Sequence, residues 1–377
     1  MSRRTPMRSG PDADLTVLMT GAGAPGASGI IESLRLTDER SFRIVGVDTN
    51  PEAYGFALVD AGHTVPPGES DEYVSRMVDV AAAEDADVIL PLTTAEIEPL
   101  AAAREAFDAT IMVSDPDALG VANDKGKLYR FLADEGFESA PTYHRVDSEA
   151  EFVDAVESLG YPETPVCFKP PVASGMRGFR VLDDRTDRLT RLLEEKPDAA
   201  VTTLSEVRPI LASAESFPEL AVMEYLPGEE YSVDVLAMGE TVGPVVPRSR
   251  ARTRAGISFE GVVEKREDLI DEAAAICRGL GLEYNVNVQF RYDADGVPKV
   301  IEINPRVSGT IVMCVGAGAN MPYLGVKHAL GESIPPVDVE WGTRMVRYWR
   351  ELFRSADGRT FHLDHESAGR RSRSQLQ

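Results

Sequence analysis

Oxygen-bearing side chains alternate with apolar ones in two stretches near residue 300. Asn287 and Gln289 alternate with valines in the first stretch, and Glu302 and Asn304 alternate with isoleucines in the second. Alternate side chains of a strand point to opposite faces, and Asp295-Gly296 between the stretches is a strong signal for a tight turn. We therefore predict a hairpin in which Gln289 lies opposite Glu302 and the two asparagines lie opposite each other.

Such a face offers oxygen ligands to a hard cation. Magnesium takes one or two carboxylates together with nucleotide phosphates, which makes Gln289, Glu302 and Asn304 candidate metal ligands. Arg306 follows directly after Pro305, and a guanidinium there is suited to stabilise charge on a transferring phosphoryl group. From the spacing alone, a polar sheet face with a satisfied Glu–Arg pair is the alternative.

The elements that must position these side chains begin with a strand and a glycine-rich loop. Residues 15–20 form a predicted strand, the loop spans residues 21–29, a helix follows over residues 30–36, and a second strand ends at Asp48. This order matches the dinucleotide fingerprint, in which an acidic residue follows the glycines by about 20 positions. NAD binding is therefore one interpretation. Pro25 inside the loop, and the lack of a second domain with a catalytic His or Lys–Tyr pair, argue against a dehydrogenase.

The alternation of strands and helices continues along the chain. Residues 73–83 and 95–107 are predicted helices, and residues 86–90 and 110–113 are predicted strands. This order implies a parallel sheet, whose carboxyl edge is the usual binding edge. Glu96 lies at that edge and is a candidate contact for an acceptor substrate. The alternative is an acid at a helix start, favoured by the helix dipole.

Two lysines stand where ammonium groups are suited to phosphates. Asn123-Asp124 predicts an N-cap for a helix over residues 125–135. Lys125 then lies at the helix start, against the preference of the helix dipole. Lys169 ends a predicted strand and is followed by the glycine-rich residues 170–178. Backbone N–H groups beside an ammonium form a phosphate cradle.

Together, these motifs resemble ATP-grasp enzymes. The resemblance is carried by Asn-Asp-Lys at 123–125, by the strand, lysine, glycine loop and strand of 165–182, and by the stretches 287–290 and 300–308. It is closest to the large-subunit branch of carbamoyl phosphate synthase, in which a Gln replaces the first acidic metal ligand. The sequence contains no Gly-x-x-x-x-Gly-Lys-Ser/Thr motif, which excludes a P-loop.

The resemblance implies an α/β fold with α+β lobes. A Rossmann-like pre-ATP-grasp domain would span residues 15–115, and a two-lobed ATP-grasp fold would span residues 116–350. Within that fold, we expect the lid at about residues 137–222 and the metal-binding lobe at about residues 223–350. The implied cofactors are ATP and Mg²⁺ or Mn²⁺, with two ions per site.

The resemblance also assigns roles to single residues. Arg306 and Lys169 would be catalytic, and the three candidate ligands above would hold metal. Glu224 would lie near the adenine amino group, and Glu230 would accept hydrogen bonds from the ribose. Without the neighbouring motifs, residues 221–236 would be interpreted as a polar hairpin. The residues implied to bind ATP are Lys125, Lys169, Ser174, Gly175, Arg177, Gly178, Glu224, Tyr225, Leu226 and Glu230.

Four arginines alternate along residues 247–256, and no acidic residue occurs between Thr241 and Phe259. On an extended segment these arginines would share one face, so an anion is expected to neutralise them. The candidates are ATP phosphates, a substrate carboxylate, or acidic residues elsewhere on the protein. The residues proposed to contact substrate are Glu96, Arg252, Arg254 and Ser308.

The composition limits the classes of function. The 377 residues, 43% of them hydrophobic, suffice for two domains or one multi-lobed domain. No apolar run is long enough to span a membrane. The formal net charge of −23 argues against a nucleic-acid partner. The isolated cysteines indicate a reducing, cytoplasmic environment, and the five histidines show no zinc-ligand spacing. Residues 1–14 and 355–377 are expected to be disordered tails.

An acidic surface with only seven lysines among 39 basic residues indicates adaptation to high salt or a GC-rich genome. The first functional hypothesis is an ATP-dependent ligase that joins a small carboxylate to an amine. A homodimer is the oligomeric state expected for it. The second is a short carbamoyl phosphate synthase-like enzyme that phosphorylates bicarbonate or carbamate. That branch tends to use arginine where this chain has lysine, and its full large subunit contains two synthetase halves. The third is a nucleotide-binding protein without catalysis, and a dehydrogenase ranks last.

Overall fold

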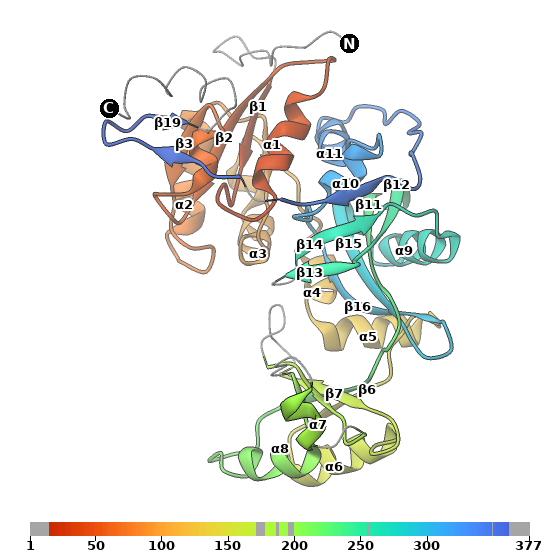
Figure 1. Cartoon of the computed structure of the whole chain (residues 1–377). Coiled ribbons are helices and arrows are strands. Elements are labelled where there is room, and N and C mark those ends of the chain that lie inside the picture. The colour runs from red at the N-terminus through yellow and green to blue at the C-terminus, as the bar shows by residue number, and fades with distance from the viewer. Residues whose placement is uncertain are drawn as a thin grey trace, which may run out of the picture.

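The structure is a computed structural model, which describes residues 15–170, 178–185, 188–194, 200–254, 257–348 and 350–361. Figure 1 shows an N-terminal part in red to orange, a small sheet with its helices in yellow to green, and a central part in teal to blue. The expected tail at residues 1–14 and residues 362–377 of the second expected tail lie outside the described residues. In the described ranges, no helix is both long and apolar enough to cross a membrane.

The N-terminal part contains a five-stranded parallel sheet in the order β3-β2-β1-β4-β5. This confirms the parallel sheet predicted from the alternating elements. Both faces are covered, because Val17 packs into one apolar cluster and Leu18 into another. The elements are β1 (Leu15–Met19), α1 (Ala27–Arg35), β2 (Phe42–Asp48), η1 (Tyr54–Ala57), β3 (Ala61–Thr64), α2 (Tyr73–Ala83), β4 (Val88–Leu90), α3 (Thr94–Ala102), η2 (Arg104–Ala106) and β5 (Thr110–Ile111).

Two helices of this part differ from their predicted bounds, whereas α2 has the predicted ones. Helix α1 begins at Ala27 rather than Ile30, because Gly26 takes a left-handed conformation with φ 103° and acts as the N-cap. Helix α3 ends at Ala102 rather than Phe107, and the chain continues as the 3₁₀ helix η2. Strand β3 was not predicted, because it is short and lacks an apolar run.

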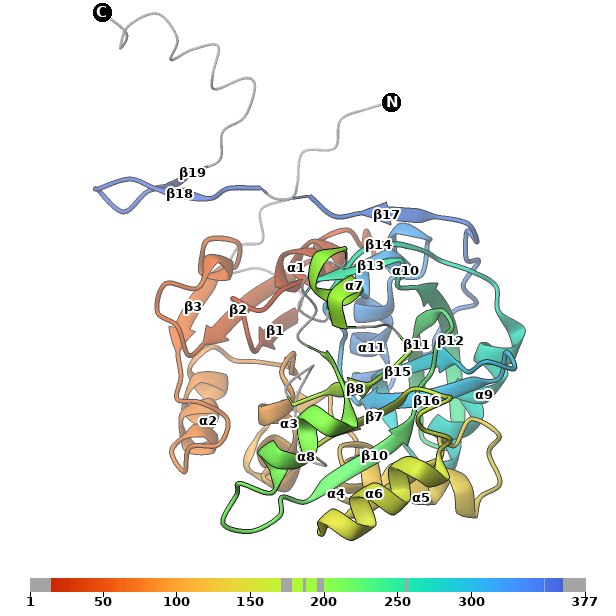
Figure 2. The same cartoon turned by 60° about the horizontal axis from the view of Figure 1, so that its bottom comes forward.

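The small sheet has the strand order β6-β10-β7-β8-β9. Its own apolar cluster contains Phe152 and Val166. Figures 1 and 2 together place α6 and α8 on the side of this sheet that faces away from the rest of the molecule. The elements are β6 (Tyr143–Val146), α6 (Glu149–Ser158), β7 (Val166–Lys169), β8 (Arg180–Leu182), α7 (Arg188–Leu193), β9 (Val201–Thr202), α8 (Leu204–Leu211) and β10 (Leu220–Glu224).

The central sheet is antiparallel, with the strand order β12-β11-β15-β16. The predicted hairpin is confirmed: Gln289 lies opposite Glu302, and Asn287 lies opposite Asn304. One face of the sheet packs in an apolar cluster with α5 and α9, so the amide and carboxyl side chains lie on the other face. The elements of this region are α4 (Pro116–Ala122), α5 (Lys125–Asp134), β11 (Glu230–Met238), β12 (Thr241–Ser249), α9 (Glu267–Gly279), β15 (Glu283–Tyr292) and β16 (Pro298–Asn304).

The remaining elements connect the central sheet to the N-terminal part. A small sheet of order β13-β14-β17 lies beside the central sheet, and β18 pairs with β19. Helices α10 and α11 share one apolar cluster with β1 and α1, so the N-terminal and central parts have a common core. The elements are β13 (Arg252–Arg254), β14 (Ile257–Val262), α10 (Val312–Gly316), α11 (Met321–Ala329), β17 (Arg344–Val346), β18 (Phe353–Arg354) and β19 (Thr360–Phe361).

Two expectations about the second half of the chain are corrected, and one alternative is wrong. The alternative is the polar hairpin over residues 221–236, because β10 belongs to the small sheet and β11 to the central sheet. The arginine-rich segment is not one extended strand: β12 ends at Ser249 and β13 begins at Arg252. The C-terminal segment, expected as a tail from residue 355, contains β19, and Arg354 forms an ion pair with Glu52 of the N-terminal part.

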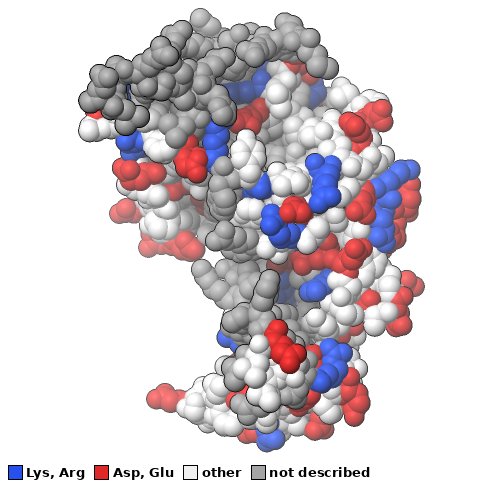
Figure 3. Space-filling view, viewed as in Figure 1, with Lys and Arg blue, Asp and Glu red and all other residues white. Residues whose placement is uncertain are grey.

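Acidic side chains are spread over the face of the molecule shown in Figure 3, with lysines and arginines between them. The net charge of −23 is therefore not gathered into one patch on this face. An acidic surface of this kind does not attract a nucleic-acid backbone. The buried cations described below form an exception to this acidic character.

Candidate active site

Lys125, Lys169 and Glu302 meet at the polar face of the central sheet. Asp124 caps α5 by accepting a hydrogen bond from the backbone N–H of Lys127, as predicted, and so fixes Lys125 at the helix start. The Nζ atom of Lys125 lies 2.8 Å from Oε2 of Glu302 and 3.1 Å from the carbonyl oxygen of Ile301. Lys169 ends β7 of the small sheet and is 7% exposed.

The charges of this cluster shift the pKa values of Glu302 and Lys169. Burial raises the pKa of Glu302, but the Lys125 ammonium outweighs burial and brings that pKa to about 2. Burial and the nearby Lys125 ammonium lower the pKa of Lys169 to about 7. When Lys169 is protonated, two cations beside one carboxylate leave excess positive charge in a partly buried place. Such a place favours a polyanion.

The other predicted metal ligands lie on the same face as Glu302. The Nδ2 atom of Asn304 donates to Oε1 of Glu302 over 3.1 Å. The Nε2 atom of Gln289 donates to Oδ1 of Asn287 over 3.4 Å. The structure therefore brings the predicted ligands together as one carboxylate and two amides. Across the described ranges, no group of three or more His, Cys, Asp or Glu side chains is arranged to hold a metal.

Arg306 follows the last strand of the hairpin, and its hydrogen-bond partners among the described residues are neutral acceptors. Its Nη2 atom donates to Oδ1 of Asn304 over 3.2 Å, and its Nη1 atom donates to the carbonyl oxygen of Val307 over 3.0 Å. Its Nε atom donates to Oγ1 of Thr94, at the start of α3, over 3.3 Å. Burial lowers the pKa of Arg306, and the charge of Glu302 partly opposes this effect. The alternative of a satisfied Glu–Arg pair is wrong, because Glu302 pairs with Lys125.

The predicted nucleoside contacts lie on the connection between β10 and β11. Glu224 accepts a hydrogen bond from the backbone N–H of Thr142 over 2.7 Å, and Leu226 is buried. The Tyr225 ring lies 6.0 Å from the Arg291 guanidinium carbon. Glu230 forms an ion pair of 2.5 Å with Arg250. The two acidic residues therefore differ in their partners, which are a backbone N–H group for Glu224 and a guanidinium for Glu230. This connection joins the small sheet to the central sheet.

The glycine loop after Lys169 is described only at its end. Ser174, Gly175 and Arg177 lie outside the described residues. Gly178 has φ 71°, and a Cβ atom added there would lie 2.5 Å from the ring of Pro170. A glycine is therefore required where the chain returns towards β8.

Glu96, predicted to contact substrate, is 6% exposed and accepts a hydrogen bond of 2.5 Å from Oγ1 of Thr20. Burial raises the pKa of its carboxyl. It lies at the carboxyl edge of the parallel sheet, as predicted. In the described residues, its side chain bonds to the protein's own hydroxyl.

The predicted substrate contacts on the arginine-rich segment have protein partners. Arg252 is exposed and forms an ion pair of 2.8 Å with Glu260. The side chain of Arg254 lies outside the described residues. Arg248 and Arg250 pair with Asp234 and Glu230. Three kinds of anion were proposed to neutralise this segment. Arg248, Arg250 and Arg252 are paired with one of them, the acidic residues of the protein.

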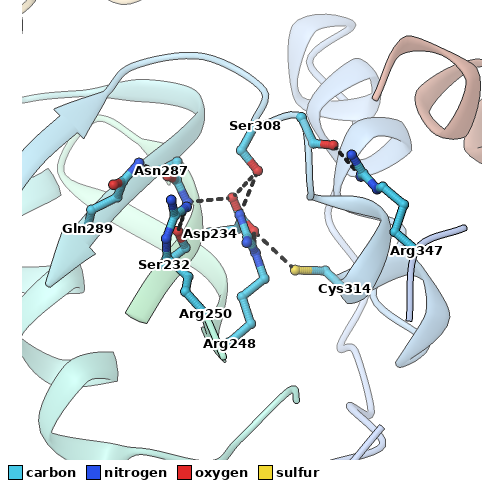
Figure 4. Close-up of polar contacts among 10 residues, drawn as sticks. Ser232, Asp234, Arg248, Arg250, Asn287, Gln289, Ser308, Cys314 and Arg347 are labelled. Atoms are coloured by element: carbon cyan, nitrogen blue, oxygen red, sulfur yellow. Dashed lines mark hydrogen bonds and ion pairs between the residues drawn. The ribbon is translucent and has the colours of Figure 1, made fainter. Parts of the chain in front are cut away.

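Sequence reasoning missed a buried network around Asp234. Figure 4 shows Asp234 with Arg248 and Asn287 of the neighbouring strands, and with Ser308 and Cys314 from the chain after the hairpin. Its Oδ2 atom accepts from Nε of Arg248 over 2.6 Å, and its Oδ1 atom accepts from Asn287 and from Ser308 over 2.9 Å each. Cys314 contributes a thiol 3.4 Å from Oδ2. The signal in the sequence was an aspartate between two valines of the strand β11.

Two family models match parts of the chain. The model for ATP-grasp in the biosynthetic pathway with Ter operon matches residues 216–349, and the model for the PylC-like N-terminal domain matches residues 17–113. The chain carries an ATP-grasp domain behind a PylC-like N-terminal domain. The predicted resemblance is thus confirmed, together with the fold class.

Relatives of known identity resemble this ATP-grasp chain over most of its length. It is 26% identical over 365 residues to the carbamoyl phosphate synthase large chain of Halobacterium salinarum, which covers 89% of this chain and 32% of that protein. The chain therefore spans about a third of that relative, and less of others such as the large chain of Streptomyces griseus, at 21%.

Solved structures share the fold at low identity. The ADP complex of N5-carboxyaminoimidazole synthetase from Staphylococcus aureus has a TM-score of 0.64 at 16% identity, covering 87% of this chain and 80% of that one. The biotin carboxylase domain dimer of Hydrogenobacter thermophilus 2-oxoglutarate carboxylase, with MgADP, ADP and bicarbonate, has a TM-score of 0.62 at 17% identity and covers 87% and 72%. Both likenesses concern the fold.

Proposed function

We propose that this chain is an ATP- and magnesium-dependent ligase that activates a carboxylate as an acyl phosphate for attack by an amine. The observation that carries the proposal is the meeting of Lys125, Lys169 and Glu302 beside Arg306. These groups come from α5, β7, β16 and the loop after β16. Their excess of cations over anions, in a partly buried place on a protein of net charge −23, suits a nucleotide triphosphate.

The chain's own residues have distinct parts in this reaction. Lys125 and Lys169 would hold the ATP phosphates as ammonium donors. The substrate carboxylate attacks the γ-phosphorus and ADP leaves; the amine then attacks the acyl carbon and releases phosphate. Arg306 would stabilise the negative charge that develops on the transferring group. Its partners in the part of the chain that the structure describes are neutral acceptors, which leaves its charge for this role.

A magnesium ion, when bound, would neutralise charge on the phosphates. Glu302, Gln289 and Asn304 would hold it, since oxygen donors suit a hard cation. With one carboxylate and two amides the protein donor set is weak, so phosphate oxygens must complete the coordination. We therefore expect metal binding to depend strongly on nucleotide, with two ions per site as the family resemblance implies.

A second candidate is a short enzyme that phosphorylates bicarbonate or carbamate. Gln289 and the likeness to the carbamoyl phosphate synthase large chain favour it. The chain spans only 32% of that relative, and it has lysines at positions 125 and 169, where that branch tends to use arginine. The two candidates share the phosphoryl-transfer site and differ in the acceptor.

The deciding experiment is an assay of ADP release from MgATP in high salt. Amino-acid pools with ammonia or amines are tested separately from bicarbonate with ammonia. We expect release that depends on a carboxylate pool and is lost in Glu302→Gln, whereas Glu264→Gln, outside the proposed site, retains it. Release with bicarbonate alone would establish the second candidate. ATP binding without release in any pool would instead support a non-catalytic nucleotide-binding protein.

A further inference from the structure

The glycine-rich loop of the N-terminal domain contacts the loop that carries Arg306. Gly26 lies against Gly309 so closely that a Cβ atom on Gly26 would collide with the carbonyl oxygen of Gly309. A Cβ atom on Gly309 would in turn lie 2.5 Å from the carbonyl oxygen of Pro25. Gly29 makes a similar approach to Val312. The glycines of this loop are therefore required for contact between the two domains.

The acidic residue of the dinucleotide fingerprint is also used within the protein. Oδ2 of Asp48 accepts a hydrogen bond from the backbone N–H of Gly23 over 2.7 Å, and Oδ1 accepts one from Asn50 over 2.8 Å. In a dinucleotide site this carboxylate would bind a ribose hydroxyl. Here the carboxylate stabilises the glycine loop itself. The glycines and Asp48 therefore have a structural role that does not require a bound dinucleotide.

The opposite side of residues 306–309, which we call the Arg306 loop, is held from within the central sheet. The Oγ atom of Ser308 donates to Asp234 and accepts from Nη2 of Arg248, both over 2.9 Å. Arg248 and Asp234 are 0% and 1% exposed. Because both charges are buried and paired, their positions are well determined. Figure 4 shows Ser308 held by this pair on the side of the loop that faces the sheet.

Further contacts fix the backbone and the guanidinium. Nη2 of Arg347 donates to the carbonyl oxygen of Gly309 over 2.9 Å. Arg306 reaches Thr94 of the N-terminal domain over 3.3 Å. The loop is thus bounded by the N-terminal domain on one side and by the buried pair on the other, with Arg306 at its start.

We propose that the glycine loop is a docking element for the Arg306 loop, and that Gly26 and Ser308 are positioning residues for Arg306. This inference rests on the proposed role of Arg306 in phosphoryl transfer. In this arrangement the N-terminal domain contributes directly to the geometry of the phosphoryl-transfer site. A displacement of about 1 Å at such a group is enough to reduce turnover by about a hundredfold.

The test compares Gly26→Ala with Gly239→Ala in the full chain. Both glycines have positive φ, of 103° and 67°, but a Cβ atom on Gly239 would have no neighbour within 4 Å in the described ranges. We expect Gly26→Ala to lower kcat for ADP release by about tenfold or more, with the KM for ATP changed by less than about twofold. Gly239→Ala should leave both constants close to wild type.

A double-mutant cycle shows whether the effect passes through Arg306. In an Arg306→Ala background, Gly26→Ala should reduce kcat by less than about twofold, because the group it positions is gone. An equal loss in both backgrounds, or an unchanged kcat for Gly26→Ala alone, would overturn the inference. Ser308→Ala should behave in the same way, with Ser258→Ala as its control, since the buried Ser258 hydroxyl has no hydrogen-bond partner among the described residues.

Hydrogen exchange separates this inference from the proposed function. Deuterium uptake over residues 305–312 should increase in Gly26→Ala and Ser308→Ala, and should stay unchanged in the two control variants. If Arg306→Ala retains full ADP release, the proposed role of Arg306 fails, while increased uptake still supports docking. Unchanged uptake in Gly26→Ala and Ser308→Ala would overturn docking, whatever the activity.

Discussion

The Nζ atom of Lys125 lies 2.8 Å from Oε2 of Glu302, so the proposed metal carboxylate is paired with a proposed phosphate ligand. Both groups are partly buried, which strengthens their interaction relative to a surface pair. The pair neutralises charge that would otherwise be costly to bury. When ATP and metal bind, each group would exchange its partner. The Lys125 ammonium would bind a phosphate, and the Glu302 carboxylate would bind the metal cation.

Removal of Lys125 should therefore have opposite effects on metal and nucleotide. Without nucleotide, Lys125→Met should bind Mn²⁺ at least about fivefold more tightly than wild type, because a positive charge beside Glu302 is lost. Its affinity for MgATP should fall by about tenfold or more. Mn²⁺ binding is measured by electron paramagnetic resonance and nucleotide binding by calorimetry. Lys127→Met, at an exposed position of the same helix, is the control, and equal changes in both lysine variants would contradict the prediction.

The affinity for MgATP should decrease as pH rises above neutrality. The pKa of Lys169 is about 7 without nucleotide, and phosphates favour its ammonium form, so its pKa in the complex must be higher. The affinity for MgATP is then constant below about pH 7 and falls until the pH reaches the pKa of Lys169 in the complex. The total fall is about tenfold for each unit by which that pKa exceeds the pKa without nucleotide. Calorimetry in buffers of different ionisation enthalpy should also show proton uptake near pH 8. Lys169→Arg should bind without this pH dependence, and a flat wild-type profile would disprove the assignment.

The hairpin of the candidate site was predictable because its information is local. The alternating side chains place Gln289 and Glu302 on one face, as predicted. The connection is longer than a two-residue turn, because it spans residues 293–297, and a register irregularity between Gln289 and Phe290 gives the predicted pair. The cap at Asp124 likewise depends on neighbouring residues. The start of α1 was predicted three residues too late. The sequence pattern does not show which glycine of the loop acts as the N-cap, and in the structure it is Gly26.

The partners of the charged residues were not predictable in the same way. Arg248 and Asp234 come from neighbouring strands, and their burial depends on the assembled sheet and on the domain that covers it. The same limit applies to Ser308, predicted to contact substrate and found bonded to both charges. The spacing of four arginines at alternate positions indicated that anions must neutralise them. Only the pairing of the strands shows that acidic residues of the protein are those anions.

The buried ion pair should matter greatly for stability. Arg248→Met leaves the Asp234 carboxylate buried without its cation, which should lower the free energy of unfolding by about 3–5 kcal/mol. Arg252→Met removes the pair with Glu260, where the arginine side chain is 60% exposed, and should cost less than about 1 kcal/mol. Urea titration followed by circular dichroism measures both. Similar midpoints for the two variants would show that the buried pair does not stabilise the fold.

The acidic surface predicts a stabilising effect of salt. At a net charge of −23, carboxylates repel one another over the folded surface. Raising KCl from about 0.1 M to about 1 M shortens the screening length from about 10 Å to about 3 Å, so the melting temperature at neutral pH should rise by several degrees. The increase should become smaller as the pH approaches the isoelectric point of about 4.7, where the net charge vanishes. Scanning fluorimetry across both variables tests this. A salt response that does not depend on pH would point to exclusion of salt from the surface rather than to charge repulsion.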